Sequence, residues 1–235
     1  MTALFTENFT DSNGTLLSAH TAGGVTWAER VAETSGTKPS IQSNQFGHVA
    51  GSFVSGAATY YVTNPLPAGR DQHLNFNIVL PATKNNFGES QMVRIGLRNV
   101  GGAGSGAGAG VIYSLYMNAD WTYTHYLYAY DSGGTLIANN TYTFNHAAGA
   151  TVAMEIDVTG DVATLKVAGT NRITLTPGSA INGTTVGTIH LRKACDGFSE
   201  CWVDSMVASY TDPPQPPMPR AAASRFAAAQ RASRW

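Results

Sequence analysis

The chain has 235 residues, of which 12% are charged and 25 are glycine, and its formal net charge is −1. This length and composition suit a single all-β domain with a two-layer core. Residues 1–212 hold all fifteen acidic residues and ten basic ones and so carry −5, whereas residues 213–235 carry +4. The body has no basic stripe, so nucleic acid is not its expected ligand.

No run reaches the ~20 apolar residues that a membrane span needs, and the start has neither the basic nor the apolar segment of a secretory signal. We therefore expect a chain that is made in the cytoplasm and has no membrane partner.

Strands are predicted in chain order by alternating apolar residues between turn signals. They fall at 2–9, 25–31, 58–62, 72–80, 92–98, in two long runs of 111–130, and at 135–138, 141–144, 152–158, 162–167, 173–175, 186–191 and 202–210, with further short strands in 36–57. A turn is expected at 139–140 and another at 169–171. Twelve or more short strands without a convincing helix predict an antiparallel β-sandwich over residues 1–211.

The composition changes abruptly after the last predicted strand. Residues 212–220 are rich in proline, which cannot join a sheet ladder, and predict an extended linker. Residues 221–235 have high helix propensity, although so short a helix is marginal in isolation. We expect a C-terminal tail that docks on a partner, through Arg220, Arg225, Phe226, Arg231, Arg234 and Trp235.

The aromatic residues are concentrated in residues 111–130, which contain six of the ten tyrosines. Asn118-Ala119-Asp120 predicts a turn between two strands. Aromatic rings with neighbouring hydroxyls bind carbohydrates, so the candidate glycan-binding residues are Trp121, Tyr123, His125, Tyr126 and Tyr128. In a regular strand 121, 123 and 125 share one face and 126, 128 and 130 the other. At least one of the two faces must build the core, and core is the commoner role of any single ring.

The sequence has few signs of metal binding, phosphate binding or nucleophilic catalysis. The six histidines lack metal-binding spacing, and no phosphate loop or nucleophile elbow occurs. Cys195 and Cys201 flank a predicted hairpin tip, where a disulfide and a pair of reduced thiols are equally compatible with the sequence. We expect no cofactor.

Several segments resemble the concanavalin A-like lectin/glucanase superfamily, in the laminin-G-like form common in bacteriophage virion proteins. The segment FTENFTDSNGTLLSAHTAGGVTW, from Phe5 to Trp27, is similar to that group's F-x-D-x-F … D-G-T-L-L-x-x-H-T … W opening. Residues 93–99, 152–169 and 186–210 resemble its later strands. The resemblance covers roughly residues 3–210 and implies an antiparallel two-sheet jelly-roll sandwich. A calcium ion in a loop occurs in this superfamily, but no acidic loop identifies one here.

Glu155-Ile156-Asp157 resembles the start of the catalytic motif of glucanases with this fold, in which a second glutamate follows two or three residues later. Retaining hydrolysis needs two carboxyl groups ~5 Å apart. Those later positions hold Thr159 and Gly160, and Asp161 comes beyond the expected turn. The favoured interpretation is that Glu155 and Asp157 form the solvent side of an amphipathic strand.

The resemblance and the tail together predict a non-enzymatic bacteriophage virion protein, for example a capsid decoration, head fibre or tail-associated protein. The sandwich would bind cell-surface glycan during host adsorption, and the tail would join other virion proteins. A homo-oligomer is compatible with this role. Two alternatives stay open: a purely structural virion component without a ligand, and a glycan hydrolase.

Overall fold

The computed structural model describes residues 2–21, 25–32, 39–47, 58–62, 71–82, 90–100, 109–131, 133–178, 188–193 and 201–211. This part of the chain contains β-strands and one 3-10 helix, Leu17–Ala19, and no helix in it is long or apolar enough to span a membrane. The predicted linker, the tail residues Arg220, Arg225, Phe226, Arg231, Arg234 and Trp235, and Cys195 lie outside the described residues.

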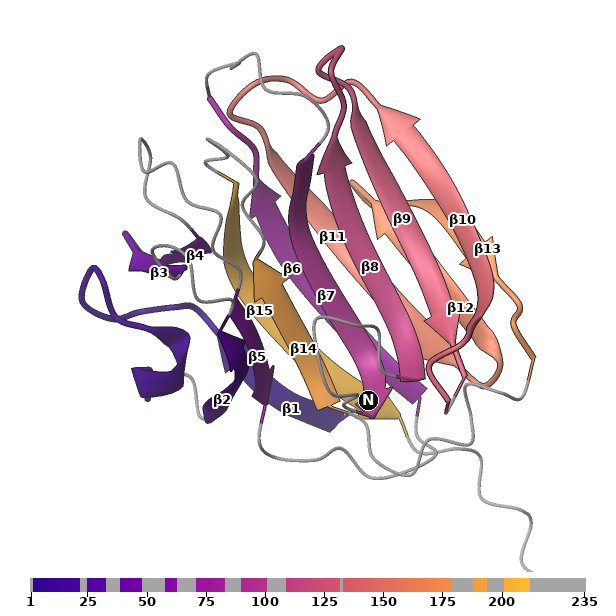
Figure 1. The fold of residues 1–235 in the computed structure, drawn as a ribbon, viewed down its shortest axis with the longest axis horizontal. Helices are drawn as coiled ribbons and strands as arrows, with labels where there is room; N and C mark the ends of the chain where they lie inside the picture. Colours follow the sequence, from indigo (N-terminus) through magenta and orange to yellow (C-terminus); the bar gives the residue numbers. More distant parts are fainter. Residues whose placement is uncertain are drawn as a thin grey trace, which may run out of the picture.

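The strands form two antiparallel sheets that pack face to face (Figure 1). Sheet A has the order β13-β12-β11-β6-β15-β4-β3, and β1 also pairs with β15. Its strands are β1 (Thr2–Glu7), β3 (Ser40–Gln42), β4 (Gln45–Gly47), β6 (Asp71–Val79), β11 (Thr151–Thr159), β12 (Val162–Val167), β13 (Thr170–Leu175) and β15 (Trp202–Thr211).

Sheet B lies in front of sheet A in Figure 1 and has the order β10-β9-β8-β7-β14-β5-β2. Its strands are β2 (Trp27–Ala32), β5 (Ala58–Val62), β7 (Ser90–Val100), β8 (Ala109–Met117), β9 (Tyr123–Tyr130), β10 (Leu136–Phe144) and β14 (Thr188–Lys193). The predicted antiparallel two-sheet sandwich is confirmed.

The core lies between the sheets and follows the alternation in the sequence. In β6, Leu74, Phe76 and Ile78 are buried, whereas Asn75 on the opposite face is exposed. The facing strands of sheet B contribute residues such as Val93, Ile95, Tyr113 and Leu115. Burying one such side chain contributes about 1.5–3 kcal/mol, so these rows hold the layers together.

Two predicted boundaries are wrong. Asn139-Asn140 is not a turn, because β10 continues through it and pairs with β9 without interruption from Ala138 to Phe144. The expected turn at 169–171 is shorter, since β13 already begins at Thr170. In both cases pairing with a neighbouring strand outweighs the local turn preference of asparagine, whereas Gly169 keeps its place in the turn with a φ of 75°.

A buried hydrogen-bond network connects the polar residues of the opening segment, Glu7 to Trp27. The Glu7 carboxylate is fully buried and accepts hydrogen bonds from the Phe9 backbone N–H at 2.7 Å and the Trp27 indole N–H at 3.1 Å. His20 is also buried and places Nε2 2.9 Å from Glu7 Oε1 and Nδ1 3.2 Å from an oxygen of Asp11. These contacts tie β1, the 3-10 segment and β2 together.

The Glu7 network predicts a large effect of a minimal substitution. Glu7→Gln places an amide donor against groups that are themselves donors, so we expect it to lower the free energy of unfolding by about 2–4 kcal/mol. Glu155→Gln is the matched control, because Glu155 is about a third exposed and its ion pair with Lys166 lies at the surface, so it should cost less than about 1 kcal/mol. Urea denaturation measures both. Equal effects would contradict this role of Glu7.

Candidate functional site

The aromatic hairpin of β8 and β9 divides its rings between the two faces of sheet B. Tyr123 and His125 point into the sandwich and are 4% and 1% exposed, so they belong to the core. Tyr126 and Tyr128 lie on the outer face and are half-buried. The expectation that one set of rings builds the core is confirmed, and the outer set remains for a ligand.

Trp121 lies in the loop between β8 and β9 and not on the strand. The turn predicted at 118–120 is present: the Trp121 N–H donates to the Asn118 carbonyl at 3.0 Å. Trp121 has a left-handed φ of 68°, so its ring does not continue the face of Tyr123 and instead packs, half-buried, against the core.

Four tyrosines form a continuous row on the outer face of sheet B, which we call the tyrosine ladder: Tyr116, Tyr126, Tyr128 and Tyr130. The rings of Tyr126 and Tyr128 are stacked, with centroids 5.5 Å apart and planes 1° from parallel. Tyr116 meets Tyr126 edge-on at 5.0 Å, and Tyr130 lies 6.1 Å from Tyr128. All four side chains are half-buried, which leaves part of each ring accessible.

The surroundings of the ladder are apolar and hydroxyl-bearing. Ile112 and Ser114 on β8 alternate with the core residues Tyr113 and Leu115, so they lie on the outer face, and both are fully buried there. Ser114 accepts a hydrogen bond from Arg94 Nε at 3.3 Å. The row therefore combines ring surface with hydroxyl groups.

The central ring of the ladder, Tyr128, is uncharged at physiological pH. Burial, with smaller contributions from the neighbouring tyrosines, raises the pKa of Tyr128 to about 12, against a small opposing effect of the Arg94 charge. Its hydroxyl therefore keeps its proton and can both donate and accept a hydrogen bond.

His125 belongs to a buried chain of polar groups. Its Nδ1 lies 3.0 Å from the Tyr113 hydroxyl and its Nε2 lies 3.0 Å from Nε2 of His146. Burial, and secondarily the charge of His146, lowers the pKa of His125 to about 3. Burial also lowers the pKa of His146. His125 is thus a neutral core residue that links two strands of sheet B to the segment after β10.

The outer face of sheet A holds a group of charged residues on β11, β12 and β6. Glu155 and Asp157 are neighbours on β11, and both bond to the ammonium group of Lys166 on β12. Asp157 also lies 2.6 Å from Nδ1 of His73 on β6. Partial burial raises the pKa of Asp157, but the hydrogen bonds from His73 and Lys166 outweigh it and leave this pKa below its ordinary value. These carboxylates are therefore engaged in ion pairs.

The glucanase-like motif does not gain a second acid from the fold. β11 pairs without a bulge from Thr151 to Val158, so the next residue on the face of Glu155 and Asp157 is Thr159. Asp161 lies beyond the end of the strand, in the turn to β12. The strand supplies an ion-paired face with Thr159 in the place of the motif's second glutamate.

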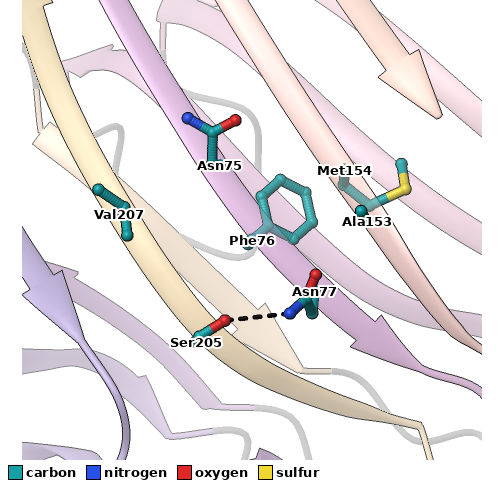
Figure 2. A pocket seen from close by; sticks show the side chains of 7 residues that line it. All are labelled: Asn75, Phe76, Asn77, Ala153, Met154, Ser205 and Val207. Carbon is teal, nitrogen blue, oxygen red and sulfur yellow. Dashed lines mark hydrogen bonds between the residues drawn. The ribbon is translucent and has the colours of Figure 1, made fainter. Parts of the chain in front are cut away.

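A shallow depression of about 130 Å³ lies on the same side of sheet A (Figure 2). It occurs where β15 bulges: the register with β6 shifts between Asp204 and Met206, and Ser205 has a left-handed φ of 40°. Asn77 Nδ2 donates to Ser205 Oγ at 3.2 Å across one wall, and Asn75 and the exposed Val207 line the other side.

Within the described ranges, no three His, Cys, Asp or Glu side chains come together as a metal site would require. Whether a loop binds calcium, and whether the chain lacks a cofactor, stay predictions. Cys201 is buried directly before β15, and because Cys195 lies outside the described residues, both interpretations of the cysteine pair stay open.

Tyr116 was missed among the candidate residues. It lies on β8, on the far side of the turn, and joins the ladder only because of the strand pairing: its backbone is opposite Thr124, which precedes Tyr126 by two residues on the same face. The register of a hairpin around 118–122 would have placed Tyr116 beside Tyr126, so the signal was present in the sequence.

No protein-family profile matches the chain, and no curated protein matches its sequence. Solved structures do match its fold. The potassium-bound carbohydrate recognition domain of Emp46p superposes with a TM-score of 0.57 at 6% identity, over 77% of this chain and 87% of that one. Lectin II from Ulex europaeus superposes with a TM-score of 0.56 at 11% identity, over 80% of this chain and 93% of that one. A LamA variant from Z. galactanivorans, in complex with laminaritriose and laminaritetraose, superposes with a TM-score of 0.55 at 10% identity, over 89% of this chain and 99% of that one.

These similarities establish the fold: the described part of the chain is a concanavalin A-like jelly-roll sandwich. At such low identity they establish the architecture alone, since one fold supports many functions.

The buried histidine pair predicts a pH-dependent stability. The unfolded chain protonates His125 near pH 6.5, whereas the folded chain does so only near pH 3. Between these values the unfolded state binds more protons, so the free energy of unfolding should fall as the pH falls below about 6.5, by up to about 1.4 kcal/mol per pH unit. His125→Phe should be less stable at pH 7 and show a shallower decline in urea denaturation between pH 7 and pH 4. A decline as steep as that of the unmodified chain would contradict this prediction.

Proposed function

We propose that this protein is a non-enzymatic glycan-binding module and that the tyrosine ladder on sheet B is its binding face. The observation that carries the proposal is the row of Tyr116, Tyr126, Tyr128 and Tyr130, partly exposed on one outer face. Sugar rings have apolar faces and hydroxyl edges, and tyrosines offer a ring surface and a hydroxyl for both.

The ladder suits an extended glycan better than a compact ligand. Three of its rings follow one another along β9 at every second residue, which is a spacing of about 7 Å along a strand. Successive sugars of a chain could each meet a ring or a tyrosine hydroxyl. The depression on sheet A is the competing site, and its volume of about 130 Å³ suits one small polar group.

The chemistry of sheet A supports a binding role without hydrolysis. Lys166 bonds both Glu155 and Asp157, and Thr159 occupies the place where a second acid would be needed. A retaining hydrolase uses one carboxyl group as nucleophile and another as acid/base. The rival hydrolase hypothesis requires such a pair to be available, and the two carboxylates on this face of β11, Glu155 and Asp157, both bond to Lys166. It predicts new reducing ends when the protein is incubated with β-glucans, and we expect none.

We further propose a place for the module on a bacteriophage virion, as a capsid decoration, head fibre or tail-associated protein. This part rests on the resemblance of residues 3–210 to virion domains and on the +4 tail that follows a −5 body. The proline-rich residues 212–220 would act as a spacer, and the tail with Phe226 and Trp235 as an anchor on another virion protein. The remaining alternative is a structural virion component with no ligand, which would bind no glycan on an array.

Binding to the ladder can be separated from binding to the depression. Tyr128→Ala removes the central ring of the row, so we expect the affinity for any glycan found on an array to fall about tenfold or more, the equivalent of about 1.4 kcal/mol. Asn75→Ala is the matched control, because Asn75 is exposed on the opposite sheet and lines the depression. It should leave the affinity unchanged in calorimetry. The reverse result would move the site to sheet A.

Deleting residues 213–235 tests the anchor. The described sandwich ends at Thr211, so we expect the truncated chain to stay folded and soluble and to keep its affinity for glycan. We also expect it to be absent from assembled particles. Circular dichroism and the protein content of purified particles measure the two outcomes, and normal incorporation of the truncated chain would refute the anchor.

A further inference from the structure

The strands of the two sheets carry opposite net charges, with histidine counted as neutral. The described strands of sheet A contain two basic and five acidic residues, a net charge of −3. Those of sheet B contain five basic residues and one acidic residue, a net charge of +4. The charged residues of the sheet B strands are Glu29, Arg30, Arg94, Arg98, Arg192 and Lys193. The −5 of residues 1–212 therefore conceals a basic sheet, and a region of one sign attracts ligands of the opposite sign.

Arg94 is a basic residue of sheet B that lies beside the tyrosine ladder. It alternates on β7 with the core residues Val93 and Ile95, so it lies on the outer face. Its register partner on β8 is Ser114, and the partner of Ser114 on β9 is Tyr126. Arg94, Ser114 and Tyr126 thus form one row across three neighbouring strands of the front sheet (Figure 1).

The side chain of Arg94 extends along this row toward the ladder. Its Nε donates to Ser114 Oγ at 3.3 Å, and Ser114 lies on the strand between β7 and β9. Burial raises the pKa of Tyr128 to about 12, and the Arg94 charge acts on this pKa in the opposite direction, as a cation near the ring does. A guanidinium has five N–H donors in a planar fork that matches the two oxygens of a carboxylate.

Two acidic residues flank β9 and mark the ends of the ladder. Asp120 precedes the strand and Asp131 follows it, and their carboxylates accept hydrogen bonds from backbone N–H groups of their own turns at 2.9–3.1 Å. A negative group of a ligand is repelled by these carboxylates and attracted to the middle of the ladder, where Arg94 lies. On β14, Arg192 is the register partner of Arg94, so two arginine positions are adjacent there.

We infer that the ligand of the tyrosine ladder is an acidic glycan, in which a sugar stacks on Tyr126 and Tyr128 and its carboxylate pairs with Arg94. This inference rests on the proposed function, because it adds a charged group to a ligand that the rings hold. Strands β7 and β9 are two strand spacings apart, about 10 Å, which the sugar and the arginine side chain span together. Uronic and sialic acids carry their carboxylate directly on the sugar ring, and its hydrogen bonds with a guanidinium are stronger than those between neutral groups.

An array that carries uronic- and sialic-acid glycans beside their carboxyl-reduced forms tests this inference, because each pair differs only in the charged group. We expect the full chain to bind at least one acidic glycan about tenfold or more tightly than its reduced form, in about 0.15 M salt. Equal affinities for the two forms would overturn the acidic ligand and leave the ladder as a binding face for neutral glycans. A chain that binds nothing on the array would overturn the proposed function as well.

Arg94→Gln tests the assignment to one residue. It should lower the affinity for the acidic glycan about tenfold in calorimetry, to that of the reduced form. The affinity for the reduced form should not change, which also shows that the variant is folded. Arg94→Lys keeps the charge and should retain more of the affinity than Arg94→Gln. Arg172→Gln is the matched control, because Arg172 lies over the ring of Tyr142, on β13 of sheet A, and should change neither affinity.

Three results would contradict the role of Arg94. If Arg94→Gln leaves the affinity for the acidic glycan unchanged, the anion binds elsewhere, for example on the basic tail. If the same variant weakens both forms equally, Arg94 supports the rings and does not recognise the charge. A single-stranded oligothymidylate also offers anions and stacking rings, and its binding more tightly than every acidic glycan on the array would overturn the glycan as the ligand class.

Discussion

The alternation of side chains along β9 is the constraint on which the site depends. Successive residues of a strand point to opposite faces, so a segment as rich in rings as 123–130 cannot place all of them in the core. Tyr123 and Leu127 pack between the sheets, and the pleat then sends Tyr126 and Tyr128 to the outside. The ladder is thus the second face of a strand whose first face holds the sandwich together.

The same alternation of side chains places different groups on the two outer faces of the sandwich. On sheet A the outward positions of β6 and β11 hold His73, Glu155 and Asp157, and these groups bond to each other or to Lys166. Ion pairs that satisfy each other offer little to a neutral ligand. On sheet B the outward positions of β8 and β9 hold rings and hydroxyls, and Arg94 on β7 donates to one of these hydroxyls, that of Ser114.

Much of this could be predicted from the sequence, because the determining signals are local. Alternation in residues 72–80 and 152–158 gives the strands and their inward faces, and Asn118-Ala119-Asp120 gives the turn. What failed depends on strand pairing or on the backbone conformation of one residue. Asn139 and Asn140 favour a turn in isolation, yet they extend a strand because β9 pairs with them, and Trp121 leaves its expected face because of the backbone of a single loop residue. Tyr116 joins the site through the register of the hairpin, which follows from the position of the turn and not from the alternation of either strand alone.

The opening motif shows why the fold is easier to infer than the function. Glu7, His20 and Trp27 are among the residues through which the sequence resembles the concanavalin A-like group, and all three are buried in one network that ties the first strands together. Replacing a buried carboxylate that accepts three hydrogen bonds destabilises the folded chain. Such a motif therefore indicates the fold and not the ligand. The ladder on β8 and β9 is subject to no such requirement, since its rings could be exchanged for other side chains without opening the core. Ligand preference can therefore differ between two proteins that share the motif, and it must be argued from the outward residues of each one.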